Sequence, residues 1–390
     1  MKKREINSLR TPVYRDTGFE LSDPDITASA FKNETDNSRE PDLYIYSRYR
    51  NPTVVAAEEE IMRVENCQWA LLTQTGMSAI DTAVSVFQKA KETRPWIFFT
   101  EIYGGTISYI DSILRKRRGV DVITFSPING KYNLEEFEKL LINTKPEFIY
   151  AETISNPLLI VTDILRIIEI SHGNNCKVII DNTFASPFLF RPLEHGADIV
   201  VHSATKYLSG HGNLTAGVVC GNNPGIMKEA VEYRKFTGHM ISPDDAYRLN
   251  TQIKTFRLRF SRQCENALLL ADLFNREKAI GKVFFPGLKD HPTHNEAVKL
   301  LGGKYFGAMI TIDFAGGTGA EKRNRRDSFI KNVSDKIKLV PTLGDPQTIL
   351  MPVESVWGAK YPEPGMVRIS AGFEEWEGLQ ATVRKGLRDL

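Results

Sequence analysis

Short apolar runs alternate with amphipathic segments between about residue 60 and residue 250 of the chain. Seven of the runs are rich in β-branched or aromatic residues, as buried strands are: WALLTQ, WIFFT, VDVITF, EFIYAE, KVIIDN, DIVVHS and AGVVCG. Within SAIDTAVSVFQKAKE, in contrast, the apolar residues recur at helical spacing: Ile80, Ala83, Val84 and Phe87. Continuous apolar strands separated by helices predict an α/β fold with a mostly parallel sheet flanked by helices.

The first 60 residues follow neither pattern. They are polar and rich in turn-forming residues, as in SDPD, KNETDNSREPD and YRNPT, and they show no long helical or strand period. Such a segment is either a disordered tail or an arm that becomes ordered against another surface.

A long helical pattern follows the central region, from about residue 243 to residue 276, and Asp244 is its expected N-cap. Beyond it, GKVFFP, YFGAMITIDF, IKLVP and MVRIS read as strands, and helices are expected near 321–332 and 374–388. This mixture predicts a smaller α+β domain. We therefore expect three parts of the chain: an arm over 1–60, a large domain over 61–250 and a C-terminal domain over 251–390.

Composition narrows the class of protein. Hydrophobic residues make up 42% and charged residues 25%, and the net charge is +2, which gives no electrostatic reason to expect a nucleic acid or a membrane as partner. The four cysteines form no CxxC pair, so we expect free thiols. The chain begins without the apolar core of a signal peptide, and no apolar run reaches membrane-spanning length. We expect a cytoplasmic protein.

Two of the predicted strands lead into groups that could hold an anion or a charge. After WALLTQ, the turn that contains Gly76 and Met77 leads into a helix, and the free N–H groups of such a helix start favour an anion. After KVII comes Asp181, followed at two residues by Thr183. A carboxylate at the end of a buried strand is costly unless it has a partner. Each feature alone is more typical of an ordinary turn or cap than of a binding site.

A third strand end carries an amine. DIVV leads into Lys206, with Ser203 and Thr205 beside it. A lysine that is desolvated in a pocket has a lowered pKa and a nucleophilic amine, although a lysine in this position can also extend to solvent. An anion site, a carboxylate and an amine at one edge of one sheet are the three requirements of pyridoxal phosphate, for its phosphate, its ring nitrogen and its aldehyde.

Two other motifs are weaker. SGHGNLTAG lacks the third glycine of a dinucleotide-binding loop, because Thr215 stands in its place. His291 and His294 of HPTH have no third ligand at a suitable spacing, so we expect surface histidines and no metal site.

The stretch DNTFASPFLFRPLEHGADIVVHSATKYLSGHGN, residues 181–213, closely resembles the signature of the Cys/Met-metabolism, or transsulfuration, family, and similar segments continue over nearly the whole chain. This family contains fold-type I pyridoxal-phosphate enzymes such as methionine γ-lyase, cystathionine γ-lyase, cystathionine γ-synthase and O-acetylhomoserine sulfhydrylase. The resemblance implies the same fold, with an N-terminal arm and a smaller C-terminal domain.

The resemblance also implies roles for residues around the cofactor. Lys206 would bond to the cofactor aldehyde and later move protons, and Asp181 would pair with the ring nitrogen. Tyr103, in EIYGGT, would stack on the ring and assist proton transfer. The other positions implied to bind the cofactor are Gly76, Met77, Asn156, Thr183, Ser203 and Thr205.

Substrate and subunit contacts are implied in the same way. Arg368, in GMVRISAGFEE, resembles the arginine that binds the substrate carboxylate, and Asn156 and Thr342 would also face the substrate. YIYSRYRNPT resembles the segment whose tyrosine and arginine reach the phosphate of a neighbouring subunit, here Tyr46 and Arg48. The resemblance thus implies at least a homodimer, and usually a homotetramer.

The exact reaction stays open at this stage. The favoured hypothesis is elimination at the γ (or β) carbon of methionine, homocysteine or cystathionine, which gives a keto acid, ammonia and a thiol. γ-Replacement is the alternative, and a non-catalytic relative is a remote one. Pro341 stands where many cystathionine-using members have glutamate, and Gly105 stands where methionine γ-lyases usually have cysteine, so the sequence points in both directions.

Overall fold

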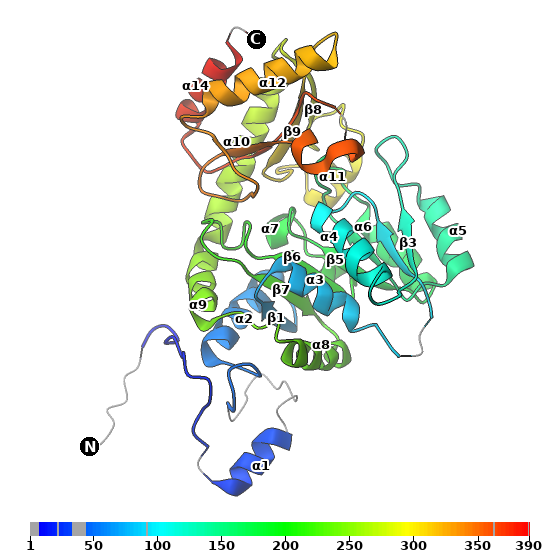
Figure 1. The fold of residues 1–390 in the computed structure, drawn as a ribbon, viewed down its shortest axis with the longest axis vertical. Helices are drawn as coiled ribbons and strands as arrows, with labels where there is room; N and C mark the ends of the chain where they lie inside the picture. Colours follow the sequence, from blue (N-terminus) through cyan, green and yellow to red (C-terminus); the bar gives the residue numbers. More distant parts are fainter. Residues whose placement is uncertain (1–7, 22, 33–43, 91–92, 362, 389) are drawn as a thin grey trace.

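A seven-stranded sheet forms the centre of the molecule (Figure 1). The computed structural model describes residues 8–21, 23–32, 44–90, 93–361, 363–388 and 390. In the strand order β1-β7-β6-β5-β4-β2-β3, the five strands from β6 to β3 are parallel, and β7 is antiparallel to both of its neighbours. The predicted mostly parallel sheet is confirmed. The strands are β1 Trp69–Thr73, β2 Trp96–Phe99, β3 Val122–Phe125, β4 Phe148–Glu152, β5 Lys177–Asp181, β6 Ile199–Ser203 and β7 Gly217–Gly221.

Helices flank this sheet, and side-chain caps fix where several of them begin. The side chains of Asn51, Thr75, Asn133, Asp163 and Asn223 each accept a backbone N–H of the helix that follows. The helices are α2 Pro52–Glu65, α3 Gly76–Ser85, α4 Gly104–Tyr109, a π-helix Ile110–Arg115, α5 Leu134–Thr144, α6 Ile164–Gly173, α7 Ser186–Leu189, a 3-10 turn Pro192–His195 and α8 Pro224–Thr237.

The N-terminal segment differs from its prediction. Helix α1 (Pro24–Lys32) lies away from the body of the molecule, and α2 begins at Pro52, inside the stretch that was expected to contain no long helix (Figure 1). Asn51 caps α2 and proline occupies its first position, which is a common way to start a helix. This start signal lay in the NPT sequence that was interpreted as a turn.

A second sheet of five strands follows in the order β10-β11-β12-β9-β8. Strand β11 (Ile349–Pro352) was absent from the prediction, whereas β8 Ile280–Phe284, β9 Met309–Phe314, β10 Lys338–Leu339 and β12 Met366–Ser370 were expected. The helices here are α11 His294–Leu301, α12 Gly319–Val333, α13 Glu354–Trp357, a 3-10 turn Gly358–Lys360 and α14 Trp376–Leu387, so both helices predicted for this region are present.

The long helix that was predicted over 243–276 is broken. It consists of α9 (Pro243–Gln252), a 3-10 turn (Ile253–Thr255) and α10 (Phe256–Asn275). The N-cap is Ser242, and the expected N-cap Asp244 lies in the first turn instead, where it pairs with Arg15 at 2.6 Å.

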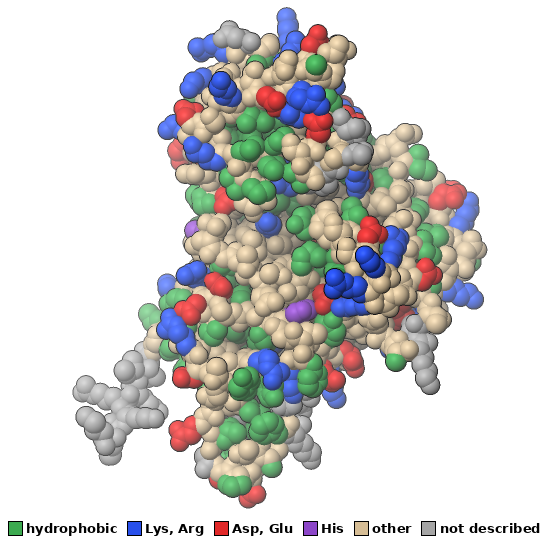
Figure 2. All heavy atoms as spheres, viewed as in Figure 1, with side chains coloured by type: hydrophobic (Ala, Val, Ile, Leu, Met, Phe, Trp, Pro, Cys, Tyr) green, Lys and Arg blue, Asp and Glu red, His purple; other side chains and the backbone are tan. Residues whose placement is uncertain are grey.

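Two surface properties follow from the structure. None of the described helices has both the length and the apolar composition needed to cross a membrane. On the face shown in Figure 2, basic and acidic side chains are interspersed.

Candidate active site

A pocket of about 250 Å³ lies between the carboxyl ends of the first sheet and the C-terminal region. Its walls come from the segments after β1, β4, β5 and β6 and from residues 341–343 and 368. Ligands of α/β proteins bind at this edge of the sheet. Eleven residues that were predicted to bind cofactor or substrate line the pocket: Gly76, Met77, Tyr103, Asn156, Asp181, Thr183, Ser203, Thr205, Lys206, Thr342 and Arg368.

Asp181 ends β5 and accepts three hydrogen bonds. The Tyr150 hydroxyl donates to Oδ2 at 3.0 Å, and the backbone N–H and hydroxyl of Thr183 donate to Oδ1 at 3.0 Å and 2.6 Å. The Thr183 hydroxyl also accepts the backbone N–H of Ser203 at 2.9 Å, which ties β5 to β6. Asp181 is therefore a buried carboxylate with a fixed orientation, facing the pocket.

Lys206 lies in the turn after β6, and its Nζ donates to Thr342 Oγ1 at 2.9 Å. The pKa of Lys206 is lowered to about 8, mainly by burial and then by the charge of Arg368, whereas Asp345 acts in the opposite direction. Gly344 permits this close packing, because a Cβ atom there would lie 2.8 Å from the carbonyl carbon of Lys206. The amine is thus available as a nucleophile near neutral pH.

The turn after β1 has the form of an anion site. Thr75 caps α3 by accepting the backbone N–H of Ser78 at 3.0 Å, and the N–H groups of Gly76 and Met77 belong to the first turn, where helices leave donors unpaired. A Cβ atom on Gly76 would lie 2.9 Å from Ser203 Cβ. Glycine is therefore required where this turn meets β6.

The hydroxyl of Thr205 is already engaged in this structure. Thr205 Oγ1 accepts the backbone N–H of Ala216 at 2.9 Å and donates to its carbonyl oxygen at 3.2 Å. Thr205 lines the pocket, and these two bonds fix the chain beside Lys206.

Arg368 crosses the pocket from the second sheet. Its guanidinium donates to Asn156 Oδ1 at 3.3 Å and to the carbonyl oxygen of Thr342 at 3.2 Å. Burial lowers the pKa of Arg368 to about 10, so the group is charged at neutral pH. A buried, charged guanidinium beside an amine is suited to a carboxylate ligand.

Tyr103 occupies the N-cap position of α4, and its side chain is 49% exposed. Its ring packs over Gly105, where a Cβ atom would lie 2.4 Å from Tyr103 Cε1. Glycine at position 105 therefore makes room for the observed position of the ring.

Tyr46 and Arg48 do not reach the pocket of their own chain. Arg48 donates to the carbonyl oxygen of Lys235 at 2.8 Å and lies over the ring of Tyr49, and Tyr46 is 40% exposed. Within the described part of the chain, neither residue lines the pocket.

Two pocket features were missed in the sequence. Glu152 ends β4 and lines the pocket, and Tyr150 on the same strand binds Asp181. The signal for Glu152 was the same as for Asp181, an acidic residue at the end of an apolar run, here FIYAE. It went unused because no motif drew attention to it.

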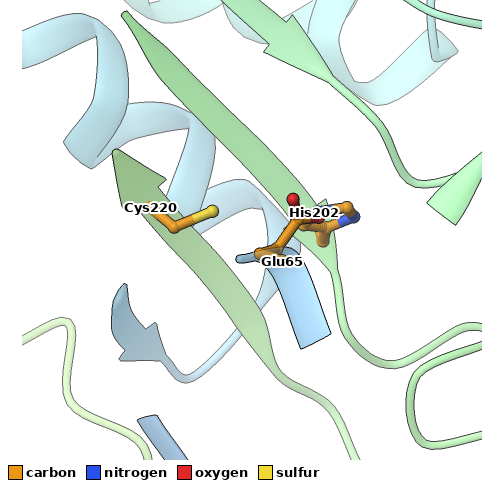
Figure 3. A group of neighbouring side chains, drawn as sticks. All are labelled: Glu65, His202 and Cys220. Carbon is orange, nitrogen blue, oxygen red and sulfur yellow. The ribbon is translucent and has the colours of Figure 1, made fainter. Parts of the chain in front are cut away.

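Three buried side chains form a cluster beside the pocket (Figure 3). His202 of β6 hydrogen-bonds to Glu65 at the end of α2, and Cys220 of β7 lies next to them. Their ligand atoms lie within 4.8 Å of one another. Burial raises the pKa of the Cys220 thiol, which therefore keeps its proton. Because the imidazole and the carboxylate already bind each other, the group links α2, β6 and β7.

The histidines of HPTH are placed differently from the prediction. His291 is buried rather than on the surface, with Nε2 3.2 Å from the carbonyl oxygen of Leu158, and burial lowers its pKa to about 4. His294 Nδ1 lies 2.9 Å from the carbonyl oxygen of Pro286. Both rings make structural contacts.

The donor set fits pyridoxal phosphate. A nucleophilic lysine, a fixed carboxylate and a helix start that only glycine allows converge on one pocket at the carboxyl edge of a mostly parallel sheet. This fold and this site define a pyridoxal-phosphate-dependent enzyme.

Comparison with known proteins identifies the family. The model of the Cys/Met metabolism PLP-dependent enzymes matches residues 1–388, and the chain belongs to this family. It is 33% identical to L-methionine gamma-lyase of Porphyromonas gingivalis, over 98% of this chain and 93% of that one. It is 34% identical to O-succinylhomoserine sulfhydrylase of Pseudomonas aeruginosa, over 89% of this chain and 84% of that one.

A solved structure with the same fold is cystathionine gamma synthase of Xanthomonas oryzae pv. oryzae in complex with cystathionine. The TM-score is 0.83 at 26% identity, and the match covers 96% of this chain and 92% of that one. The relatives thus include enzymes named for elimination and for replacement, and the chain is a PLP-dependent lyase or transsulfuration enzyme.

Proposed function

We propose that the protein cleaves the carbon–sulfur bond of methionine or homocysteine by elimination at the γ carbon and releases a keto acid, ammonia and a thiol. The observation that carries this proposal is the balance of charge in the pocket. Four Asp, Glu, Lys or Arg side chains are found among the described lining residues: Glu152, Asp181, Lys206 and Arg368.

Each of these four groups already has a use. Arg368 serves the substrate α-carboxylate, Lys206 the amine chemistry and Asp181 the cofactor nitrogen, and Glu152 binds the backbone of Tyr103. Among the described lining residues, no cation is left for a second carboxylate, such as that of cystathionine or a succinyl group. The remaining walls include apolar side chains that suit a thioether: Met77, Ile154, Phe184, Pro341 and Leu343.

The cofactor site follows from the same residues. Gly76 and Met77 would bind the phosphate through backbone N–H groups, with Ser203 and Thr205 beside it. Asp181, held by Thr183, would face the ring nitrogen, Asn156 the ring hydroxyl, and Tyr103 the ring itself.

When bound, pyridoxal phosphate supplies an aldehyde for the substrate amine and a ring that accepts the electrons of the α C–H bond. Lys206 Nζ then takes the α-proton, and its lowered pKa suits it to act as a base near neutral pH. Arg368 would orient the substrate by binding the substrate carboxylate, and Thr342, whose carbonyl oxygen accepts from Arg368, lies beside it. The Tyr103 hydroxyl is the group placed to move a second proton.

The assembly belongs to the same proposal. Tyr46 and Arg48 lie outside their own pocket, which supports a site completed by a second copy of the chain, in a homodimer or a homotetramer of two such dimers. We place the enzyme in the cytoplasm, in line with its buried free cysteines.

A substrate panel tests the reaction. The holoenzyme is incubated with methionine, homocysteine, cystathionine and acylated homoserines, with and without sulfide or cysteine, and keto acid, ammonia and thioether are measured. Keto acid and ammonia from methionine alone support the proposal. Turnover of an acylated homoserine that occurs only when a thiol is supplied overturns it in favour of γ-replacement, and Lys206→Ala controls for background.

A further inference from the structure

A second buried carboxyl group lies beside Asp181. Glu152 ends β4 in register with Asp181 at the end of β5, and both side chains line the pocket. They are 6% and 8% exposed. Residues in register on adjacent strands project to the same face of the sheet. Two carboxyl groups in such a site do not both ionise without a large cost.

The hydrogen bonds decide which group keeps the proton. Asp181 accepts three, as described above, whereas Glu152 Oε1 accepts the backbone N–H of Tyr103 at 2.5 Å. Burial, and then the charge of Asp181, raise the pKa of Glu152 well above its ordinary value, and Glu101 adds to the rise. The Tyr103 N–H and Lys360 act against it.

Glu101 and Lys360 are further charged groups that act on Glu152. Glu101 accepts the hydroxyl of Tyr361 at 2.6 Å and lies 3.5 Å from Lys360 Nζ. Lys360 is thus paired with Glu101, and this pairing reduces how strongly its ammonium group can stabilise a negative charge on Glu152. These contacts favour the protonated form of Glu152.

The contact with Tyr103 gives this group a role. Tyr103 is the N-cap residue of α4, but its side chain makes no capping hydrogen bond. The Glu152 carboxyl therefore holds the backbone at the residue from which the phenol reaches the pocket. A rigid support for a reacting side chain matters because small displacements reduce rates strongly.

We propose that Glu152 is a positioning residue that works as a neutral carboxylic acid. Its Oε1 holds the backbone of Tyr103, and its proton avoids a second negative charge beside Asp181. The inference rests on the PLP chemistry of the family and does not depend on which sulfur amino acid is the substrate.

Three variants of the holoenzyme separate charge from geometry. Glu152→Gln keeps the length and the acceptor without a charge, Glu152→Asp keeps the acid but is one methylene shorter, and Glu138→Gln is the control on the exposed face of α5. We expect Glu152→Gln to keep kcat within about threefold, and Glu152→Asp to lose about tenfold or more in kcat with a smaller change in KM. The activity of Glu152→Gln should also fall less at alkaline pH than that of the wild type.

Unfolding gives a readout that needs no substrate. Because the folded protein keeps a proton on Glu152 that the unfolded chain loses above the ordinary carboxyl pKa, the folding equilibrium weakens by up to about tenfold per pH unit above that value. Glu152→Gln removes this dependence. Its melting temperature should therefore rise relative to wild type as the pH increases, whereas the difference between Glu138→Gln and wild type stays constant.

Two results would overturn the proposal. One is a Glu152→Gln enzyme that is as impaired as Glu152→Asp at neutral pH, which means that the charge is needed. The other is a melting difference between Glu152→Gln and wild type that does not change with pH. If methionine is not the substrate, the kinetic comparison is made with whichever sulfur amino acid of the panel is turned over, and the melting comparison needs no turnover at all, so failure of the proposed function is distinguishable from failure of this inference.

Discussion

Lys206 owes its reactivity to its surroundings rather than to its sequence neighbours. The side chain is buried, lies near the charge of Arg368 and has a hydroxyl, that of Thr342, as its hydrogen-bond partner. A neutral amine is cheaper to bury than an ammonium ion, so the fold itself favours the nucleophilic form.

A pH dependence follows for Lys206. Since its pKa is lowered to about 8, the rate at which the cofactor-free enzyme captures pyridoxal phosphate should rise with pH and level off above about pH 8. For an exposed lysine, the capture rate would continue to rise with pH up to the ordinary lysine pKa of about 10.4. Stopped-flow absorbance measures the rate, and a rise that continues unchanged to pH 10 would contradict the lowered pKa.

Gly76 allows a second prediction. A methyl group at this position comes within 2.9 Å of Ser203 Cβ, so Gly76→Ala should displace the turn and weaken cofactor binding by about 10- to 100-fold, or about 1–3 kcal/mol. Gly378→Ala is the matched control, because no atom lies within 4 Å of a Cβ there. Equilibrium titration with the cofactor compares the two, and equal affinities would contradict the steric argument.

The sequence pointed to residues of the pocket where a polar side chain followed a buried strand. Asp181 and Lys206 were found in this way, and Glu152 had the same signal but no motif. Arg368 was found only through the resemblance, because no local pattern shows that a residue on the second sheet crosses to Asn156. Pairings between distant segments depend on the packing of whole elements, which one sequence does not display.

Among the elements, α10 has an effect on the lysine turn that the sequence did not show. Arg259 is buried, and its guanidinium donates to the carbonyl oxygens of Tyr207 and Leu208 at 3.1 Å and 3.2 Å, directly after Lys206. A Cβ atom on Gly210 would lie 1.6 Å from Arg259 Nη1. The helix and the lysine turn therefore pack so closely that no side chain fits at position 210.

Arg259→Met should leave these carbonyl groups without donors. We expect a loss of about 1–3 kcal/mol in stability and a lower kcat at similar KM, because the lysine is displaced while Arg368 still binds substrate. Arg257→Met, on the exposed side of α10, should behave like wild type. Thermal unfolding and steady-state kinetics test both, and an unchanged kcat for Arg259→Met would limit the arginine to a stabilising role.

Continuous apolar runs predicted the strands of the central sheet well, whereas strand β11 and helix α2 were missed although both contain buried residues. Every strand expected in the central sheet is present, because such strands are continuous apolar runs. Strand β11 was missed, and its length does not explain this, because β2 and β3 are also four residues long and were predicted. Helix α2 was missed because its start was interpreted as a turn.

At the scale of the whole molecule, the arm and the pocket belong to different copies in the proposed assembly. Chains with Lys206→Ala and chains with Arg48→Ala should each be impaired alone. Random co-assembly should restore about a quarter of wild-type activity, because half of the dimers are hybrids with one intact site each. Mixed and unmixed preparations are compared in one assay, and no gain on mixing would place Arg48 outside the partner's site.

The bonds of Arg368 to Asn156 and Thr342 have a consequence for ligand selection. The bond to Asn156 links Arg368 of the second sheet to the segment after β4, so a ligand of the guanidinium has to offer it a stronger acceptor than an amide oxygen and a peptide carbonyl. A free carboxylate does so, whereas a methyl ester or a primary amide does not. If Arg368 binds the substrate carboxylate as proposed, blocked amino acids and internal peptide residues should therefore be poor substrates.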